Sequence, residues 1–163
     1  MSSVSIGDRG TDSDALWNPH SILFAAAKNL LAFPVTVAQV SSPDPSNPWQ
    51  WGDTIFQGAY VYNISLEGGI QFKGAITHKS AGQDIWSTWG DEINRILYIG
   101  SDLYTLSDTQ LKVNDLATLA DIATLGLPQP PPPPDYFIPL EPGPVILPVI
   151  SVSTTNATIF LTH

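Results

Sequence analysis

The segment Val61-Tyr-Asn-Ile-Ser-Leu-Glu-Gly-Gly-Ile70 recurs in altered form as Val113-Asn-Asp-Leu-Ala-Thr-Leu-Ala-Asp-Ile122, which starts 52 residues later. At this offset, Ile64 aligns with Leu116. Each copy has apolar residues of strand type, an Asn or Asp turn, a short break and one further apolar run. A repeat of about 50 residues with about four strands per unit is typical of a propeller blade.

Short apolar runs separated by polar turns fill most of the chain before residue 128. Runs with strand character lie at 21–24, 30–40, 58–66, 70–77, 93–99, 103–106 and 111–113. Helical periodicity is weak and is confined to 14–17 and 116–125. This pattern is typical of a sandwich, a barrel or a propeller, and the repeat favours the propeller. We therefore expect an all-β fold, a partial β-propeller with about two blades of four-stranded antiparallel sheet.

Proline marks a change of character near residue 128. Ten of the fifteen prolines lie at or beyond Pro128, five of them in the run Pro130 to Pro134. Proline lacks an amide donor and clashes with the preceding helical turn, so residues 128–144 predict an extended proline-rich strap or linker. The β-branched residues of 145–163 predict a strand-forming C-terminal tail. The expected division is a partial β-propeller region at 1–127, the strap, and the tail.

Charge and composition exclude several classes of function. The chain has 163 residues, with 6 basic and 15 acidic side chains, a net charge of −9 and a pI near 4.3. Such an acidic surface repels phosphate, which argues against nucleic acid as a partner and disfavours anionic membranes. No cysteine is present, so disulfides and thiolate chemistry are excluded. The sequence contains no apolar run long enough for a transmembrane segment and begins without a signal peptide.

Five segments, in this order along the chain, carry a resemblance to a known family. They are Ile6-Gly-Asp-Arg-Gly-Thr-Asp-Ser-Asp-Ala-Leu16, Asn29-Leu-Leu-Ala-Phe-Pro-Val35, Phe56-Gln-Gly-Ala-Tyr-Val-Tyr62, Ile93-Asn-Arg-Ile-Leu-Tyr-Ile-Gly-Ser-Asp-Leu-Tyr-Thr-Leu-Ser107 and Lys112-Val-Asn-Asp-Leu116. Together they resemble secreted archaeal and bacterial proteins with a C-terminal β-propeller domain that is distantly related to WD40 propellers. The resemblance implies the final blades of such a domain and an extracellular or cell-surface location.

The resemblance also raises the question of how the blade edges are covered. A propeller closes with four or more blades, whereas this chain has room for about two. We therefore expect open strand edges, which invite pairing with another strand. The tail segment 145–152 is a candidate for that strand, either within its own chain or in a neighbouring copy. The second possibility would make the protein a homo-oligomer.

Asp8, Asp12 and Asp14 form the densest polar cluster and lie in a glycine-flanked segment. Carboxylates at this spacing suit a hard cation such as calcium, although the spacing is not that of an EF-hand. The alternative is structural, with Asp12 or Ser13 capping a short helical turn. In either case Arg9 could pair with a neighbouring aspartate. No cofactor is expected apart from this possible calcium ion.

Four tryptophans in two loops are candidate ligand-binding residues, namely Trp49, Trp51, Trp86 and Trp89. Aromatic rings of this kind stack on sugars, but they also plug loops over blade ends or line interfaces. Asp53, Asp91 and Glu92 lie in the same loops, and a pair of carboxylates is what a glycoside hydrolase needs. Hydrolysis of an extracellular polysaccharide is therefore retained as an alternative function.

The two internal histidines, His20 and His78, are interpreted as structural or surface groups. Neither belongs to a recognisable nucleophile or zinc motif, since Gly-x-Ser-x-Gly and His-Glu-x-x-His are both missing from the sequence. The expected function is consequently non-enzymatic: an extracellular or cell-surface β-propeller module that binds protein or polysaccharide. A structural subunit that assembles with its own copies by exchange of the tail strand is a further alternative.

Overall fold

The structure is a computed structural model, and it describes residues 2–80, 82 and 90–128. The chain divides into two units, 1–129 and 130–163, and only the first contains described residues. The expected tail at 145–163 and, apart from Pro128, the expected strap at 128–144 therefore lie outside the described residues.

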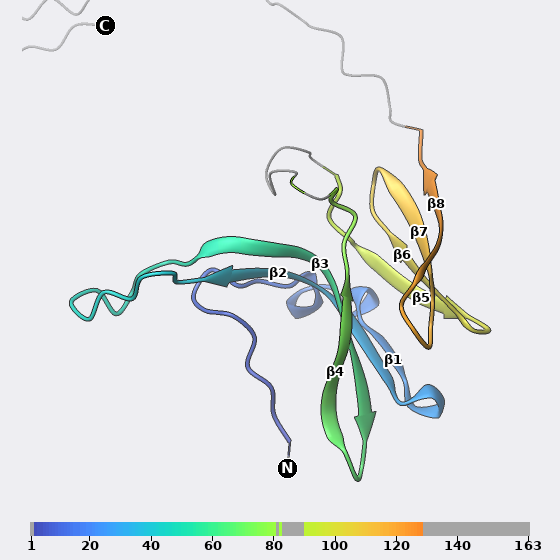
Figure 1. The fold of residues 1–163 in the computed structure, drawn as a ribbon, viewed down its shortest axis with the longest axis horizontal. Coiled ribbons are helices and arrows are strands. Elements are labelled where there is room, and N and C mark those ends of the chain that lie inside the picture. The colour runs from blue at the N-terminus through green and yellow to red at the C-terminus, as the bar shows by residue number, and fades with distance from the viewer. Residues whose placement is uncertain (1, 81, 83–89, 129–163) are drawn as a thin grey trace, which may run out of the picture. The chain divides into compact units, whose positions relative to one another are not determined.

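Two four-stranded antiparallel sheets make up the described part of the chain (Figure 1). The strands are β1 (Leu23–Ala25), β2 (Leu30–Gln39), β3 (Asp53–Ser65), β4 (Gly69–Ile76), β5 (Arg95–Ile99), β6 (Asp102–Leu106), β7 (Gln110–Asp115) and β8 (Asp121–Gly126). Three single 3₁₀ turns accompany them, namely η1 (Asp14–Leu16), η2 (Pro19–Ser21) and η3 (Ala26–Lys28). The strand order is β1-β2-β3-β4 in the first sheet and β5-β6-β7-β8 in the second. The all-β partial propeller with two four-stranded blades is confirmed.

The two sheets repeat each other in detail. In the first sheet the Ile64 amide donates to the carbonyl of Asn29, and in the second the Leu116 amide donates to the carbonyl of Ser101, both at 2.7 Å. The register also shifts at equivalent places, after Val61 in the β3–β4 pair and after Val113 in the β7–β8 pair. The repeat found in the sequence therefore corresponds to a repeated hairpin, and both copies have the same register shift in their strand pairing.

The 52-residue alignment fails in the last strand of each sheet. Nine residues separate the partners Tyr62 and Phe72, whereas six separate Asn114 and Asp121. The second hairpin is therefore three residues shorter. Ile122 occupies the bulged position in β8 that Lys73 occupies in β4, so the alignment of Ile122 with Ile70 that the 52-residue offset predicts is wrong.

The weak helical periodicity at 116–125 is also misleading. Residues 121–126 form β8, which pairs with β7 along its length, and the preceding residues make the hairpin turn. Pairing with an existing strand outweighs the small intrinsic preference of these residues for a helix. At 14–17 the periodicity corresponds only to the single turn η1.

A hydrophobic cluster joins the two sheets. Its buried members are Ala25, Leu30, Ala32, Ala59, Val61, Ile76, Ile93, Ile96, Leu103 and Leu116. Small side chains dominate the contribution of β2 and β3, which lets the second sheet approach closely. Burial of these groups at about 25 cal/mol per Å² supplies the main force that holds the sheets together.

Equivalent positions of the two sheets face the same direction. Val61 faces the shared core, so its neighbour Tyr62 lies on the outer face of the first sheet. In the second sheet Asn114 is paired with the core residue Leu103 and is buried, so Val113 lies on the outer face. The sheets are thus stacked in the same sense, as successive blades of a propeller are.

Both outer faces carry apolar side chains. The aromatic outer face of β1–β4 consists of Phe24, Phe33, Tyr60, Tyr62 and Phe72, and Phe24 is 63% exposed. The aliphatic outer face of β5–β8 consists of Leu97, Ile99, Leu111, Val113 and Leu125, of which Ile99 is 64% exposed. Each sheet therefore offers a further packing surface opposite the one it already uses.

Candidate functional site

Trp49 and Trp51 project from the loop between β2 and β3 and remain 71% and 67% exposed. The Arg9 guanidinium lies 5.0 Å from the ring centroid of each, a cation–π contact with both indoles. The Gly52 amide donates to the Arg9 carbonyl at 2.8 Å and ties the two segments together. Arg9 therefore orders the tryptophan pair, and among the described residues no ion pair joins it to an aspartate.

A cavity of about 480 Å³ lies beside Trp51. Thr11, Asp12, Thr36 and Thr54 contribute hydroxyl and carboxylate groups to its lining. This combination of one flat apolar ring and several short polar side chains can contact both the face and the hydroxyls of a sugar ring. Trp86 and Trp89, the other two candidate tryptophans, lie outside the described residues.

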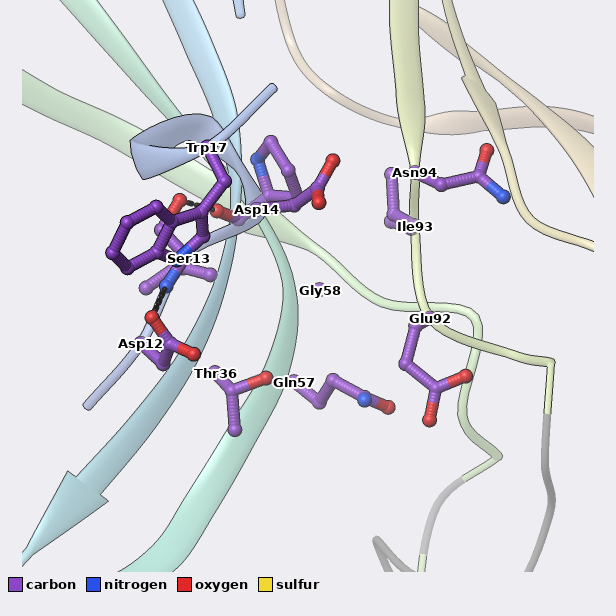
Figure 2. Close-up of a pocket in the computed structure, with 12 residues that line it drawn as sticks. Asp12, Ser13, Asp14, Trp17, Thr36, Gln57, Gly58, Glu92, Ile93 and Asn94 are labelled. Carbon is purple, nitrogen blue, oxygen red and sulfur yellow. Dashed lines mark hydrogen bonds between the residues drawn. The ribbon is translucent and has the colours of Figure 1, made fainter. Parts of the chain in front are cut away.

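A second cavity, of about 320 Å³, lies between the β2–β3 region and the segment that precedes β5 (Figure 2). Its lining includes Asp12, Asp14, Trp17, Gln57 and Glu92. Asp12 also lines the cavity beside Trp51, as does Thr36, so the two cavities adjoin. Figure 2 shows Asp14 and Glu92 on opposite sides of this cavity, with the Gln57 side chain extending toward Glu92.

The capping interpretation of the aspartate cluster is confirmed at Ser13. Its hydroxyl oxygen accepts from the Ala15 amide at 3.2 Å and caps η1, while the hydroxyl donates to the Pro34 carbonyl of β2. Asp12 reaches the same strand through an isolated bridge with Thr36. These contacts attach the N-terminal segment to β2 and position the acidic side chains at the cavity rim.

The three aspartates of the expected calcium loop do not share a common set of contacts. Asp8 accepts from the Val40 amide at 2.9 Å, whereas Asp14 accepts from the Asn18 side chain at 3.1 Å. Asp8 lines a different cavity from the one that Asp12 and Asp14 share. In residues 2–80, 82 and 90–128, no group of three or more acidic, His or Cys side chains is arranged to hold a metal ion. The calcium loop stays a prediction.

His78 follows β4 and lies buried against the second sheet. Its Nδ1 is 2.9 Å from the Ser107 hydroxyl, and its Nε2 is 2.9 Å from the Thr105 hydroxyl. Ser107 contacts Thr109, which donates to Asp91 at 2.5 Å. A neutral imidazole satisfies this chain, with one ring nitrogen donating and the other accepting.

The pKa of His78 is lowered from 6.5 to about 4, mainly by burial and also by the nearby Lys112 ammonium, against a smaller opposing effect of Asp91. Both ring nitrogens are occupied, and the residue is only 7% exposed. The network therefore holds β4 to β6 and has no access to a substrate. His20, by contrast, is exposed in η2.

The candidate carboxylates have different environments. Asp91 is 7% exposed and faces the Lys79 ammonium at 3.5 Å in a buried ion pair. Asp53 and Glu92 are exposed, at the start of β3 and ahead of β5 respectively. Asp91 is thus a structural group that secures the segment after β4.

Two residues at the second cavity were missed by the sequence interpretation. Trp17 is 81% exposed at the end of η1, and Gln57 is 7% exposed within β3. The Gln57 Oε1 atom is buried without a hydrogen-bond partner. A glutamine between apolar neighbours of a strand was the available signal, because a polar side chain at such a position needs a partner.

Comparison with known proteins agrees with the architecture. The family model of the β-propeller domain matches residues 1–119. No curated protein and no solved structure matches the chain significantly. Within the part of the chain described here, no helix is long and apolar enough to cross a membrane. With two equivalent sheets stacked in the same sense and a family match over most of its length, the chain belongs to the β-propeller domain family.

Proposed function

We propose that this chain is a non-enzymatic binding module that recognises polysaccharide through the cavity beside Trp51. The observation that carries the proposal is the exposed pair Trp49 and Trp51, held by Arg9 next to a cavity with hydroxyl and carboxylate groups. Protein is the other class of partner expected from the sequence. The proposed extracellular or cell-surface location is supported by the resemblance to secreted proteins.

The preference for polysaccharide has a physical basis. Sugar rings present an apolar face of C–H groups and an equatorial belt of hydroxyls. An indole fixed in orientation binds the face without a large loss of side-chain entropy, because Arg9 already restricts it. The Thr11 hydroxyl already bonds the backbone of Ala38, so the hydroxyls of Thr36 and Thr54 and the Asp12 carboxylate are the groups suited to the hydroxyl belt.

The non-enzymatic part of the proposal draws support from Asp91. Its carboxylate lies in the buried ion pair with Lys79 and accepts from Thr109, so it is unavailable to a substrate. The alternative of a polysaccharide hydrolase would depend on Asp53 and Glu92. Release of reducing ends from soluble polysaccharides, lost in Asp53→Asn or Glu92→Gln, would support hydrolysis against our proposal.

The binding proposal is tested by affinity electrophoresis in gels that contain soluble polysaccharides, among them neutral glucans and chitin oligosaccharides. We expect retardation of the full chain by at least one of them, and a loss of affinity of about 10-fold or more in the variant with both Trp49→Ala and Trp51→Ala. Leu66→Ala, at a fully exposed turn position, is the matched control. Equal retardation of the double variant, or no retardation of the full chain by any polysaccharide, would refute the proposal.

A second candidate function is assembly with further copies of the chain. The aromatic outer face of β1–β4 is equivalent in position to the side that β5–β8 presents to the core, and the aliphatic outer face of β5–β8 is equivalent to the core-facing side of β1–β4. A second copy could therefore stack head-to-tail and continue the packing already present between the sheets. The exposure of Phe24, Phe72, Ile99 and Leu125 favours such a contact.

The solution mass measured by light scattering tests this second candidate. We expect an oligomer that dissociates when Phe72→Lys places a charge on the aromatic outer face. An oligomer that survives this change but is lost on deletion of 128–163 would support exchange of the tail strand. A monomer at all accessible concentrations would refute both forms of assembly.

A further inference from the structure

The second cavity has a pronounced negative character. Asp12 and Asp14 contribute carboxylates from the N-terminal segment, and Glu92 contributes one from the segment ahead of β5. None of the described residues that line it is a lysine or an arginine. Trp17, an aromatic residue whose ring can attract a cation, also lines it. These groups favour a ligand with a positive charge.

Gln57 provides an independent indication of a ligand. Its side chain is 93% buried and lines the cavity, and within the described part of the chain its Oε1 atom has no hydrogen-bond partner. A buried acceptor that lacks a partner costs about 1–3 kcal/mol, so a donor group at this position would be bound favourably. Figure 2 shows the Gln57 side chain extending toward Glu92, which places two acceptors on the same part of the cavity.

The position of this cavity indicates which kind of ligand carries the positive charge. It shares Asp12 and Thr36 with the cavity beside Trp51, so the two cavities lie next to each other. A sugar that carries a protonated amino group satisfies both sites. In such a ligand the ring would lie against the indole, and the ammonium would face the carboxylates and the Gln57 amide.

We propose that the cavity lined by Asp14, Gln57 and Glu92 binds the protonated amino group of an amine-bearing polysaccharide whose next sugar ring lies beside Trp51. This assignment rests on the proposed function and specifies its ligand class. Selectivity follows from charge: acetylation of the amino group removes the positive charge and the ammonium donors, while the sugar backbone stays the same.

The test compares a glucosamine hexamer with an N-acetylglucosamine hexamer by isothermal titration calorimetry, at mildly acidic pH and physiological ionic strength. We expect the full chain to bind the glucosamine hexamer about 10-fold more tightly than the acetylated one. Glu92→Gln should reduce this preference about 3-fold or more. Gln57→Met, which keeps the volume but removes the unpaired acceptor, should also reduce the preference without destabilising the fold.

The control variant is Glu67→Gln, which removes an exposed carboxylate from the β3–β4 turn. It should leave the preference unchanged, which separates a specific site from general attraction to an acidic protein. Equal affinity for the two hexamers, or a preference that Glu92→Gln and Gln57→Met leave intact, would overturn the proposal. A lysine hexapeptide that binds with the same dependence on Glu92 and at least equal affinity would overturn the assignment to polysaccharide.

The same titrations separate this proposal from the proposed function. If both hexamers bind with equal affinity and Trp51→Ala weakens both, the polysaccharide module stands and the amine site fails. If the glucosamine hexamer depends on Glu92 and Gln57 but not on Trp51, the amine site stands and the role of the tryptophan pair fails. If neither hexamer binds, the assignment to an amine-bearing polysaccharide is refuted.

Discussion

Acidification should destabilise the protein through His78. Its imidazole is neutral in the folded protein because burial and Lys112 hold its pKa at about 4, whereas the unfolded chain has the ordinary value of 6.5. Between these two values the unfolded chain binds a proton that the folded protein does not. The stabilising contribution of His78 to the free energy of unfolding is therefore fully present above pH 6.5 and is lost as the pH falls toward 4.

The expected magnitude follows from this difference in pKa. At 1.36 kcal/mol for each pKa unit, the difference corresponds to about 3 kcal/mol, which residual solvent contact of the ring reduces to about 2 kcal/mol. That is a large share of the 5–15 kcal/mol typical of a folded domain. The residue lies between β4 and β6, so its protonation would loosen the contact between the sheets.

Urea unfolding at about pH 7.5 and about pH 4.5 measures the effect in the wild type and in His78→Gln, which does not titrate. We expect the wild type to lose about 2 kcal/mol more than the variant between these conditions. A ring titration of His78 by NMR in the wild type needs no variant, and its midpoint should lie near 4. Equal losses in both proteins, or a midpoint near 6.5, would refute the reasoning.

Three further predictions concern the stability of the sheets, each measured by denaturant unfolding. Gly58→Ala would place a Cβ 2.2 Å from a backbone oxygen of β4 and should lower the free energy of unfolding by more than about 2 kcal/mol. Gly126→Ala, with open space around it, should have little effect, and equal losses in the two variants would contradict this prediction. Leu103→Ala should cost about 2–5 kcal/mol because the side chain is fully buried between the sheets, and a cost below about 1 kcal/mol would show that the core is not shared. Asp91→Asn should cost about 2–4 kcal/mol, since it removes the buried charge opposite Lys79, and a neutral effect would contradict the ion pair.

The blade architecture could be predicted from local sequence. Alternation in the β3 region, the turn at 66–69 and the repeat around Ile64 and Leu116 are properties of neighbouring residues, and each translates directly into strands and hairpins. The cap at Ser13 was predictable for the same reason, because a hydroxyl and the amide it caps are two residues apart. β8 was not, because its residues become a strand only by pairing with β7.

The candidate sites, in contrast, depend mainly on contacts between residues that are far apart in the sequence. The sequence identified Trp49 and Trp51 as candidate ligand-binding residues of one loop, but only the folded chain brings Arg9, forty residues before Trp49, over both rings. It also suggested a role for the aspartates, yet their separation into two cavities depends on how the N-terminal segment crosses β2.

The sequence by itself therefore determined the class of fold, the strand order within each hairpin and the acidic character of the surface, because these depend on composition and on contacts between near neighbours. The tertiary structure decided which residues meet. His78 joins Thr105 and Ser107, and Gln57 is left with a buried acceptor in a cavity that Glu92 also lines, because the two sheets stack in one sense and bury some polar groups while leaving others exposed. Contacts between residues far apart in the chain depend on that stacking, and no local pattern encodes them.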